Sequence, residues 1–163
     1  MTATRHTISV LVNNQPGVLQ RVSGLFGRRG FNIESITVGA SEEPGLSRMI
    51  IVTTGDDRTI EQVEKQLYKL IDVIKVVNLS TRPMVARELA LIQVQAEPSM
   101  RPEILGIVDT FRAAVVDISP TSLIVQVVGD SSKIDAMAEL LKPYGILEFS
   151  RTGVTAMIRG FAK

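Results

Sequence analysis

The sequence has 163 residues, of which 45% are hydrophobic and 21% are charged, so the chain is expected to fold around a core rather than remain disordered. Eighteen Lys and Arg residues against seventeen Asp and Glu residues leave a formal charge of +1, without the concentrated basic field that attracts nucleic acid. The lack of cysteine excludes disulfides and thiolate metal sites, and no apolar run approaches the about 20 residues that span a bilayer. We therefore expect a cytoplasmic protein that binds neither nucleic acid nor a membrane.

Elements in the first half of the chain are expected in the order βαββαβ. Apolar residues that alternate along a segment are typical of a strand, and apolar residues that recur every three or four positions are typical of a helix. In chain order these patterns predict a strand over 6–12, a helix over 18–29, strands over 31–40 and 47–54, a helix opened by a capping box from Thr59 to Gln62, and a strand over 74–79. The apolar phase changes part-way along the second strand, which indicates a bulge near Glu34 or Ser35.

The second half repeats this order after a polar break that contains Pro83. The elements expected there are a strand over 88–96, a helix with Pro102 in its first turn, a hairpin of strands over 114–118 and 122–128, a helix after GDSS, and a strand over 146–149. Asp56 and Asp130 precede corresponding helices of the two halves and are expected to cap them. A last alternating stretch over 152–160 predicts an added edge strand. The fold class is therefore expected to be α+β, with two tandem βαββαβ units.

No catalytic or metal site is expected from the residues themselves. The only histidine, His6, opens a predicted strand without the partners of a triad. The neighbouring acids Asp56 and Asp57 stand where a helix cap is expected, so they are interpreted as capping residues rather than as an acid and base pair. The glycines form neither a GxGxxG pattern nor a P-loop, which leaves nucleotide binding by those routes without support.

The loop before the first helix has the features of a carboxylate site. The backbone N–H groups of Gly17, Val18 and Leu19 are expected at the helix start, where they lack helical partners and the helix dipole is positive. Gly17 leaves space for close approach of a ligand. The amide of Asn32 both donates and accepts hydrogen bonds, which suits a zwitterion. Because Pro-Gly and Asn are also common in ordinary turns, the pattern alone leaves both a ligand site and a plain turn open.

Several longer runs resemble the small regulatory subunit of acetolactate synthase (acetohydroxyacid synthase). NNQPGVLQRVSGLFG and RGFNIESITVG carry the resemblance in the first half, and VARELALIQV, VDISP and RTGVTAMIRG carry it in the second. It covers nearly all of the chain. It implies two tandem ferredoxin-like units, namely an ACT domain over 1–80, a linker over 81–84 and a C-terminal ferredoxin-like domain over 85–163.

The resemblance also implies partners and a site. It implies a homodimer formed through the ACT domain, with a branched-chain amino acid, in the first place valine, at the interface. The effector-binding residues that it implies are Asn14, Gly17, Val18, Leu19, Asn32 and Ile33. The chain itself would have no catalytic site and bind no cofactor or metal. Its partner would be a large catalytic subunit that carries thiamine diphosphate, Mg²⁺ and FAD, which the small subunit activates and subjects to feedback inhibition.

Three other classes share parts of the pattern. An RNA-binding RRM has the order βαββαβ, but the segment SRMIIVTT lacks the aromatic residues that stack on bases. An acylphosphatase-like enzyme is also ferredoxin-like, but the first loop lacks an arginine-bearing phosphate cradle. A stand-alone ACT-domain amino-acid sensor that acts on a different enzyme is the alternative, and a thiamine-dependent large subunit that co-purifies with the chain would exclude it.

Overall fold

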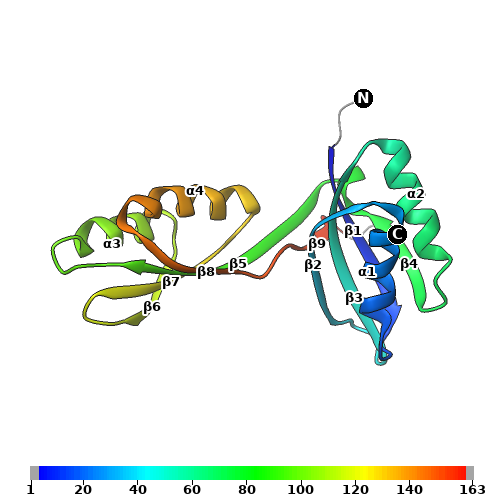
Figure 1. Ribbon diagram of the computed structural model, residues 1–163, viewed down its shortest axis with the longest axis horizontal. Coiled ribbons are helices and arrows are strands. Elements are labelled where there is room, and N and C mark those ends of the chain that lie inside the picture. The colour runs from blue at the N-terminus through cyan, green and yellow to red at the C-terminus, as the bar shows by residue number, and fades with distance from the viewer. Residues whose placement is uncertain (1–3, 161–163) are drawn as a thin grey trace. The chain divides into compact units, whose positions relative to one another are not determined.

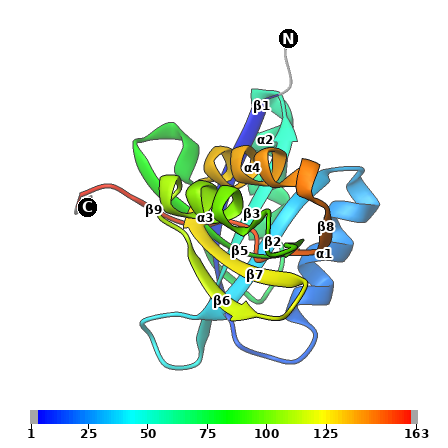
Figure 2. The same cartoon turned by 90° about the vertical axis from the view of Figure 1, so that its left-hand side faces the viewer.

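The computed structural model describes residues 4–160, which form two compact units. One unit comprises residues 4–85 with 154–160, and the other comprises residues 86–153. Each unit has an antiparallel sheet and two helices, and the helices of each unit lie over one face of its sheet (Figures 1 and 2). The predicted α+β class with two tandem ferredoxin-like βαββαβ units is confirmed.

The first unit contains a four-stranded sheet in the order β2-β3-β1-β4 (Figure 1). Its elements are β1 (Thr4–Asn13), α1 (Val18–Arg29), β2 (Asn32–Ala40), β3 (Leu46–Gly55), α2 (Asp57–Tyr68), β4 (Val73–Asn78) and the 3₁₀ turn η1 (Leu79–Thr81). Each outer strand, β2 or β4, pairs with one other strand among the described residues, so its second edge faces outward. The register of β2 against β3 shifts between Ile33 and Ser35, which confirms the predicted bulge.

The core of the first unit lies between the sheet and its helices. Alternate residues of β1, such as Ile8 and Val10, point to this side because side chains on a strand alternate between the two faces. Val22 and Phe26 of α1 meet them, four residues apart on one helix face, and Leu67 does so from α2. All five side chains are almost fully buried.

Two aspartates cap the starts of corresponding helices in the two units. The carboxylate of Asp56 accepts a hydrogen bond from the N–H of Thr59 at 2.8 Å, and that of Asp130 accepts one from the N–H of Lys133 at 2.9 Å. The two predicted caps are confirmed, but the predicted capping box that begins at Thr59 is wrong. Helix α2 begins at Asp57, so Thr59 is the third residue of the helix and supplies the backbone donor.

The second unit contains a sheet whose main path is β6-β7-β5-β8. Its elements are β5 (Met84–Gln95), α3 (Arg101–Thr110), β6 (Ala114–Ile118), β7 (Ser122–Gly129), α4 (Ser131–Leu141), the 3₁₀ turn η2 (Lys142–Tyr144) and β8 (Ile146–Arg151). The predicted hairpin of β6 and β7 is present. The core lies between the sheet and the two helices, as in the first unit. The turn η1 ends at Thr81 and β5 begins at Met84, so the linker expected over 81–84 contains one residue of each.

The last described residues pack with the first unit. The hydroxyl of Thr37 donates a hydrogen bond to the carbonyl oxygen of Val154 at 3.0 Å. The N–H of Arg159 donates to the carbonyl oxygen of Pro83 at 2.9 Å. We call residues 154–160 the return segment. These residues fall within the range predicted for the second domain, but they group with the first unit.

The return segment covers the face of the first sheet that is turned away from its helices. Ile50 and Val52 lie on this face and are almost fully buried, although neither belongs to the core on the helix side. Ile50 pairs with Thr37, so the hydrogen bond from Thr37 to Val154 places the segment over these side chains. Part of it, β9 (Thr155–Ile158), pairs with β5, which confirms the predicted additional strand.

Candidate functional site

Helix α1 begins without a side-chain cap from the described residues. Gly17 occupies the N-cap position with a φ of 83°, a left-handed conformation that glycine adopts without strain. The N–H of Val18 reaches the carbonyl oxygen of Gln15 only at 3.4 Å, which is long for a hydrogen bond. The first turn contains no acidic residue. The positive end of the α1 dipole is therefore available to an anion.

The side chain of Arg21 lies beside Gly17. A Cβ atom on Gly17 would stand 2.9 Å from Nη1 of Arg21, so only a glycine leaves this approach open without a shift of the arginine. The Nε atom of Arg21 donates to Oδ2 of Asp72 at 2.8 Å, and the Asp72 side chain is only 10% exposed. The carbonyl oxygen of Asp72 also accepts from the N–H of Asn13 at 2.9 Å. Asp72 is thus attached both to α1 and to the last residue of β1, directly before the loop into that helix.

The pair of Arg21 and Asp72 was not predicted from the sequence. The two residues are 51 positions apart, and neither periodicity nor spacing indicates such a contact. A partial signal is that Arg21 follows Gly17 by four positions, which places both on the same side of the helix start. The arginine adds a full positive charge to the partial charge of the helix end.

The aspartate caps show what a carboxylate does at a helix start in this protein. Hydrogen bonds from the backbone and side chain of Thr59 lower the pKa of Asp56 below its ordinary value. The backbone N–H of Lys133 and the hydroxyl of Ser132 lower the pKa of Asp130 in the same way. The N–H groups at these helix starts therefore favour the charged form of a carboxylate. At α1 a ligand carboxylate would find the same kind of donors without a resident aspartate.

Four of the six predicted effector-binding residues lie around the start of α1. Asn14 belongs to the loop, where its N–H donates to the carbonyl oxygen of Gly45 at 2.9 Å. Gly17 is the N-cap, and Val18 is buried as the first residue of the helix. Leu19 is 46% exposed, so this side chain is available to a ligand or to another chain.

The other two predicted residues, Asn32 and Ile33, lie at the opposite end of the sheet. Asn32 pairs with Thr54, and Thr54 pairs with Arg5 near the beginning of β1. The loop into α1 follows the other end of this strand. Because β1 has 10 residues, its ends are about 30 Å apart at about 3.3 Å per residue. One chain therefore does not bring the six residues together.

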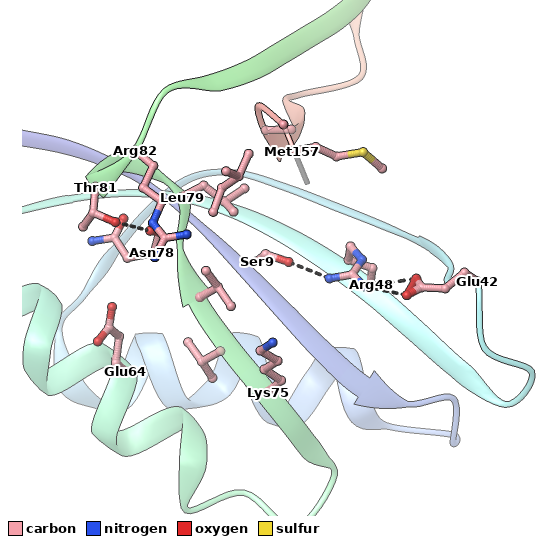
Figure 3. Close-up of a pocket in the computed structure, with 15 residues that line it drawn as sticks. Ser9, Glu42, Arg48, Glu64, Lys75, Asn78, Leu79, Thr81, Arg82 and Met157 are labelled. Carbon is pink, nitrogen blue, oxygen red and sulfur yellow. Dashed lines mark hydrogen bonds and ion pairs between the residues drawn. The ribbon is translucent and has the colours of Figure 1, made fainter. Parts of the chain in front are cut away.

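A separate groove of about 890 Å³ lies along β4 and the return segment (Figure 3). In it Arg48 lies between Ser9 and Glu42, to whose side-chain oxygens it donates at 3.0 and 3.1 Å. Lys75 and Arg82 also line the groove. None of the predicted effector-binding residues is among its lining residues. The groove and the start of α1 are thus different sites.

Residues 4–160 contain no cluster of three or more His, Cys, Asp or Glu side chains that could hold a metal ion. Over the same residues, no helix is both long enough and apolar enough to cross a membrane. His6 contacts the hydroxyl of Thr4 at 2.8 Å and the amide of Asn78 at 3.2 Å, so its ring is engaged by neutral polar groups.

Comparisons with known proteins assign the family. A model described as the AHAS small subunit-like ACT domain matches residues 8–75, and one described as the small subunit of acetolactate synthase matches residues 87–160. The probable acetolactate synthase small subunit of Methanothermobacter thermautotrophicus is 57% identical over 161 residues, which cover 98% of this chain and 96% of that protein. The chain belongs to the acetolactate synthase small-subunit family.

Other members of the small-subunit family match over nearly their whole length. The acetolactate synthase small subunit of Bacillus subtilis is 52% identical over 157 residues, covering 96% of this chain and 91% of the relative. The crystal structure of the acetolactate synthase small subunit from Thermotoga maritima superimposes with a TM-score of 0.90 at 46% identity, covering 98% and 99% of the two chains. The resemblance inferred from motifs such as RGFNIESITVG is confirmed.

Proposed function

We propose that this member of the small-subunit family regulates a separate large catalytic subunit of acetolactate synthase. It raises the activity of that subunit and makes it responsive to a branched-chain amino acid, with valine as the first effector. The observation that carries the proposal is the uncapped start of α1 beside Arg21. Backbone N–H groups and a guanidinium together are well suited to the carboxylate of an amino acid.

The first sheet has two outer edges, at β2 and at β4, and they differ in a way that favours pairing of two copies through β2. At the edge of β4, the hydroxyl of Tyr68 accepts from the N–H of Val76 at 3.0 Å and donates to its carbonyl oxygen at 3.2 Å. This side chain occupies backbone groups that a further strand would need. Beside β2, in contrast, Val38 and Leu19 are about half exposed. A second copy that pairs at β2 would cover these apolar side chains.

Pairing at β2 would also complete the effector site. If the two β2 strands run antiparallel about a two-fold axis, Asn32 of one copy lies beside Ala40 of the other. Ala40 precedes the turn whose Gly45 holds Asn14, so this end of β2 is close to the start of α1. Two copies would thus bring together the residues that one chain keeps apart, with Asn32 and Ile33 from one copy facing Gly17 of the other.

The chemistry of this composite site suits a small apolar amino acid. The start of α1 and Arg21 would hold the carboxylate, and the amides of Asn14 and Asn32 would bind the polar groups of the zwitterion. Ile33 and Leu19 would provide apolar contacts for the side chain, whose burial is worth about 1.5–3 kcal/mol for valine. The synthase reaction itself would take place on the large subunit, with its thiamine diphosphate, Mg²⁺ and FAD.

The test is an assay of acetolactate formation from pyruvate by the purified large subunit, with and without this chain. We expect no product from the chain alone, a clear rise in turnover when the two are mixed, and loss of that rise as valine is added. Leucine and isoleucine titrations establish the order of preference. The proposal would be overturned if mixing left turnover unchanged, or if none of the three amino acids changed the turnover of the mixture.

A further inference from the structure

The first unit carries a second exposed apolar surface, at the edge of the sheet opposite to β2. We call it the α2–β4 patch, and it consists of Tyr68, Ile71 and Ile74, which are 54%, 92% and 49% exposed. The N–H of Val73 donates to the carbonyl oxygen of Leu70 at 3.1 Å, so Ile71 lies in a tight turn between α2 and β4. Grouped apolar side chains on a turn and a sheet edge are typical of a protein interface.

A partner of this patch has to bind through side chains rather than by adding a strand, because Tyr68 already occupies the edge of β4 at Val76. One exposed cation stands beside the patch. Lys69 follows Tyr68 and forms no ion pair with another described residue. The complementary surface is therefore an apolar pocket with an acidic group at its rim, opposite Lys69.

We propose that the α2–β4 patch docks on the large subunit of acetolactate synthase. This inference rests on the proposed function, which supplies that partner. A second copy of this chain fits less well, because a two-fold contact of the patch with itself would bring the Lys69 side chains of both copies together. Two further exposed apolar residues of the first unit, Leu19 and Val38, are the ones that the proposed second copy would cover at β2.

The same turn connects the patch to the effector site. Asp72 follows Ile71 directly, its carbonyl oxygen accepts from the N–H of Asn13, and its carboxylate accepts from Arg21. An effector carboxylate that arrives at Gly17 competes with Asp72 for the guanidinium of Arg21. Binding of the effector therefore weakens the contact between Arg21 and Asp72, which helps to fix the turn that contains Ile71. Such a connection couples two separate sites through one movable element.

The docking surface is tested with the variant Ile71→Glu in the full chain, by measuring its affinity for the purified large subunit. Because Ile71 is 92% exposed, the substitution should leave thermal unfolding unchanged. We expect affinity at least tenfold weaker than that of the unaltered chain. The matched control is Ile118→Glu, since this isoleucine on β6 is also well exposed, at 66%, and should bind normally.

Two results would overturn the docking surface. One is equal affinity of the Ile71→Glu chain and the unaltered chain for the large subunit. The other is loss of self-association in Ile71→Glu with large-subunit binding intact, which would make the patch a contact between copies. A large subunit that binds the chain without being activated would instead overturn the proposed function and leave the docking surface standing.

The connection to the effector site is tested with Asp72→Asn, which keeps the size of the side chain and removes its charge. In the unaltered chain, saturating valine should change the affinity for the large subunit. In Asp72→Asn that change should shrink at least threefold, while calorimetry still detects valine binding to the chain. The same valine-dependent change in both proteins would show that Asp72 does not connect the two sites.

Discussion

Arg151 holds the carboxylate of Glu88 with two hydrogen bonds, from Nε to Oε1 at 3.0 Å and from Nη2 to Oε2 at 2.8 Å. The Glu88 side chain is only 4% exposed, and the hydroxyl of Ser131 adds a third hydrogen bond at 2.7 Å. Arg151 also contacts Asp135 at 2.7 Å. The ion pair thus joins β5 and β8 to α4 in the second unit.

Removing the arginine should destabilise the protein more than removing the whole pair. Arg151→Met leaves the Glu88 carboxylate buried without its cation, a change that costs about 3 kcal/mol in comparable buried pairs. The double variant Arg151→Met with Glu88→Met has no charge to leave unpaired and should lose less. Urea unfolding of the single and double variants measures this difference. Equal losses in the two proteins would contradict the interpretation.

Stability should fall as the solution becomes acidic. Burial raises the pKa of Glu88, but hydrogen bonds from Arg151 and Ser131 and the charge of Arg151 outweigh it and hold the pKa below its ordinary value. The pKa values of Asp56 and Asp130 are lowered too. A carboxyl whose pKa is lower in the folded state than in the unfolded state stabilises the fold. This contribution is complete at pH values above the unfolded pKa of about 4, and it is lost as the pH falls through the folded pKa.

This pH dependence is measured as the thermal midpoint between neutral pH and about pH 3. The midpoint should be level near neutrality and decline at acidic pH. In Glu88→Gln the neutral-pH midpoint should be lower and the acidic decline smaller, because one of the responsible carboxyls is gone. A decline of the same size in this variant would assign the pH dependence to other groups.

Gly17→Asp should abolish the response to valine and leave activation of the large subunit largely intact. The new carboxylate would stand next to Arg21 and repel the carboxylate of the effector. A loss of about 3 kcal/mol of effector binding shifts half-inhibition more than a hundredfold. The control is Gly30→Asp, since Gly30 also has a positive φ, of 70°, but ends α1. Equal valine sensitivity in the two variants would place the effector elsewhere.

A fragment of residues 1–85 should fold, since it contains the core between the first sheet and its helices. It lacks the return segment, however, and exposes Ile50 and Val52 on the other face. Joining residues 154–160 to it through a flexible linker should raise the free energy of unfolding by about 2 kcal/mol, mainly through burial of Val154. Chemical denaturation of both fragments measures the gain. Identical midpoints would show that the return segment does not stabilise this unit.

Most elements of the fold could be predicted because their patterns are local. The alternation of Ile8, Val10 and Val12 indicates a strand with one face in the core, and all three side chains lie there. The phase change in β2 could indicate a bulge for the same reason. The start of α2 was misplaced because Asp56 and Thr59 are both residue types that cap helices, and only the backbone conformation of Asp56 distinguishes them.

What could not be predicted depends on contacts between distant parts of the chain. The alternation over 152–160 indicated a strand, but nothing in it indicated that Val154 would meet Thr37 in the first unit. The contact of Arg21 with Asp72 is non-local in the same way. The proposed effector site was harder still, because Asn32 and Gly17 lie at opposite ends of one sheet, so that only the proposed second copy would bring them together.

The hydroxyl of Tyr68 on the edge of β4 also limits how far strands can associate. A sheet with two adhesive edges can grow without end into a fibre, because each added chain offers a new edge. Here one edge is occupied by the side chain of its own protein. If two copies join through β2 as proposed, the outermost strand on each side would be β4, and polymerisation would stop at the pair.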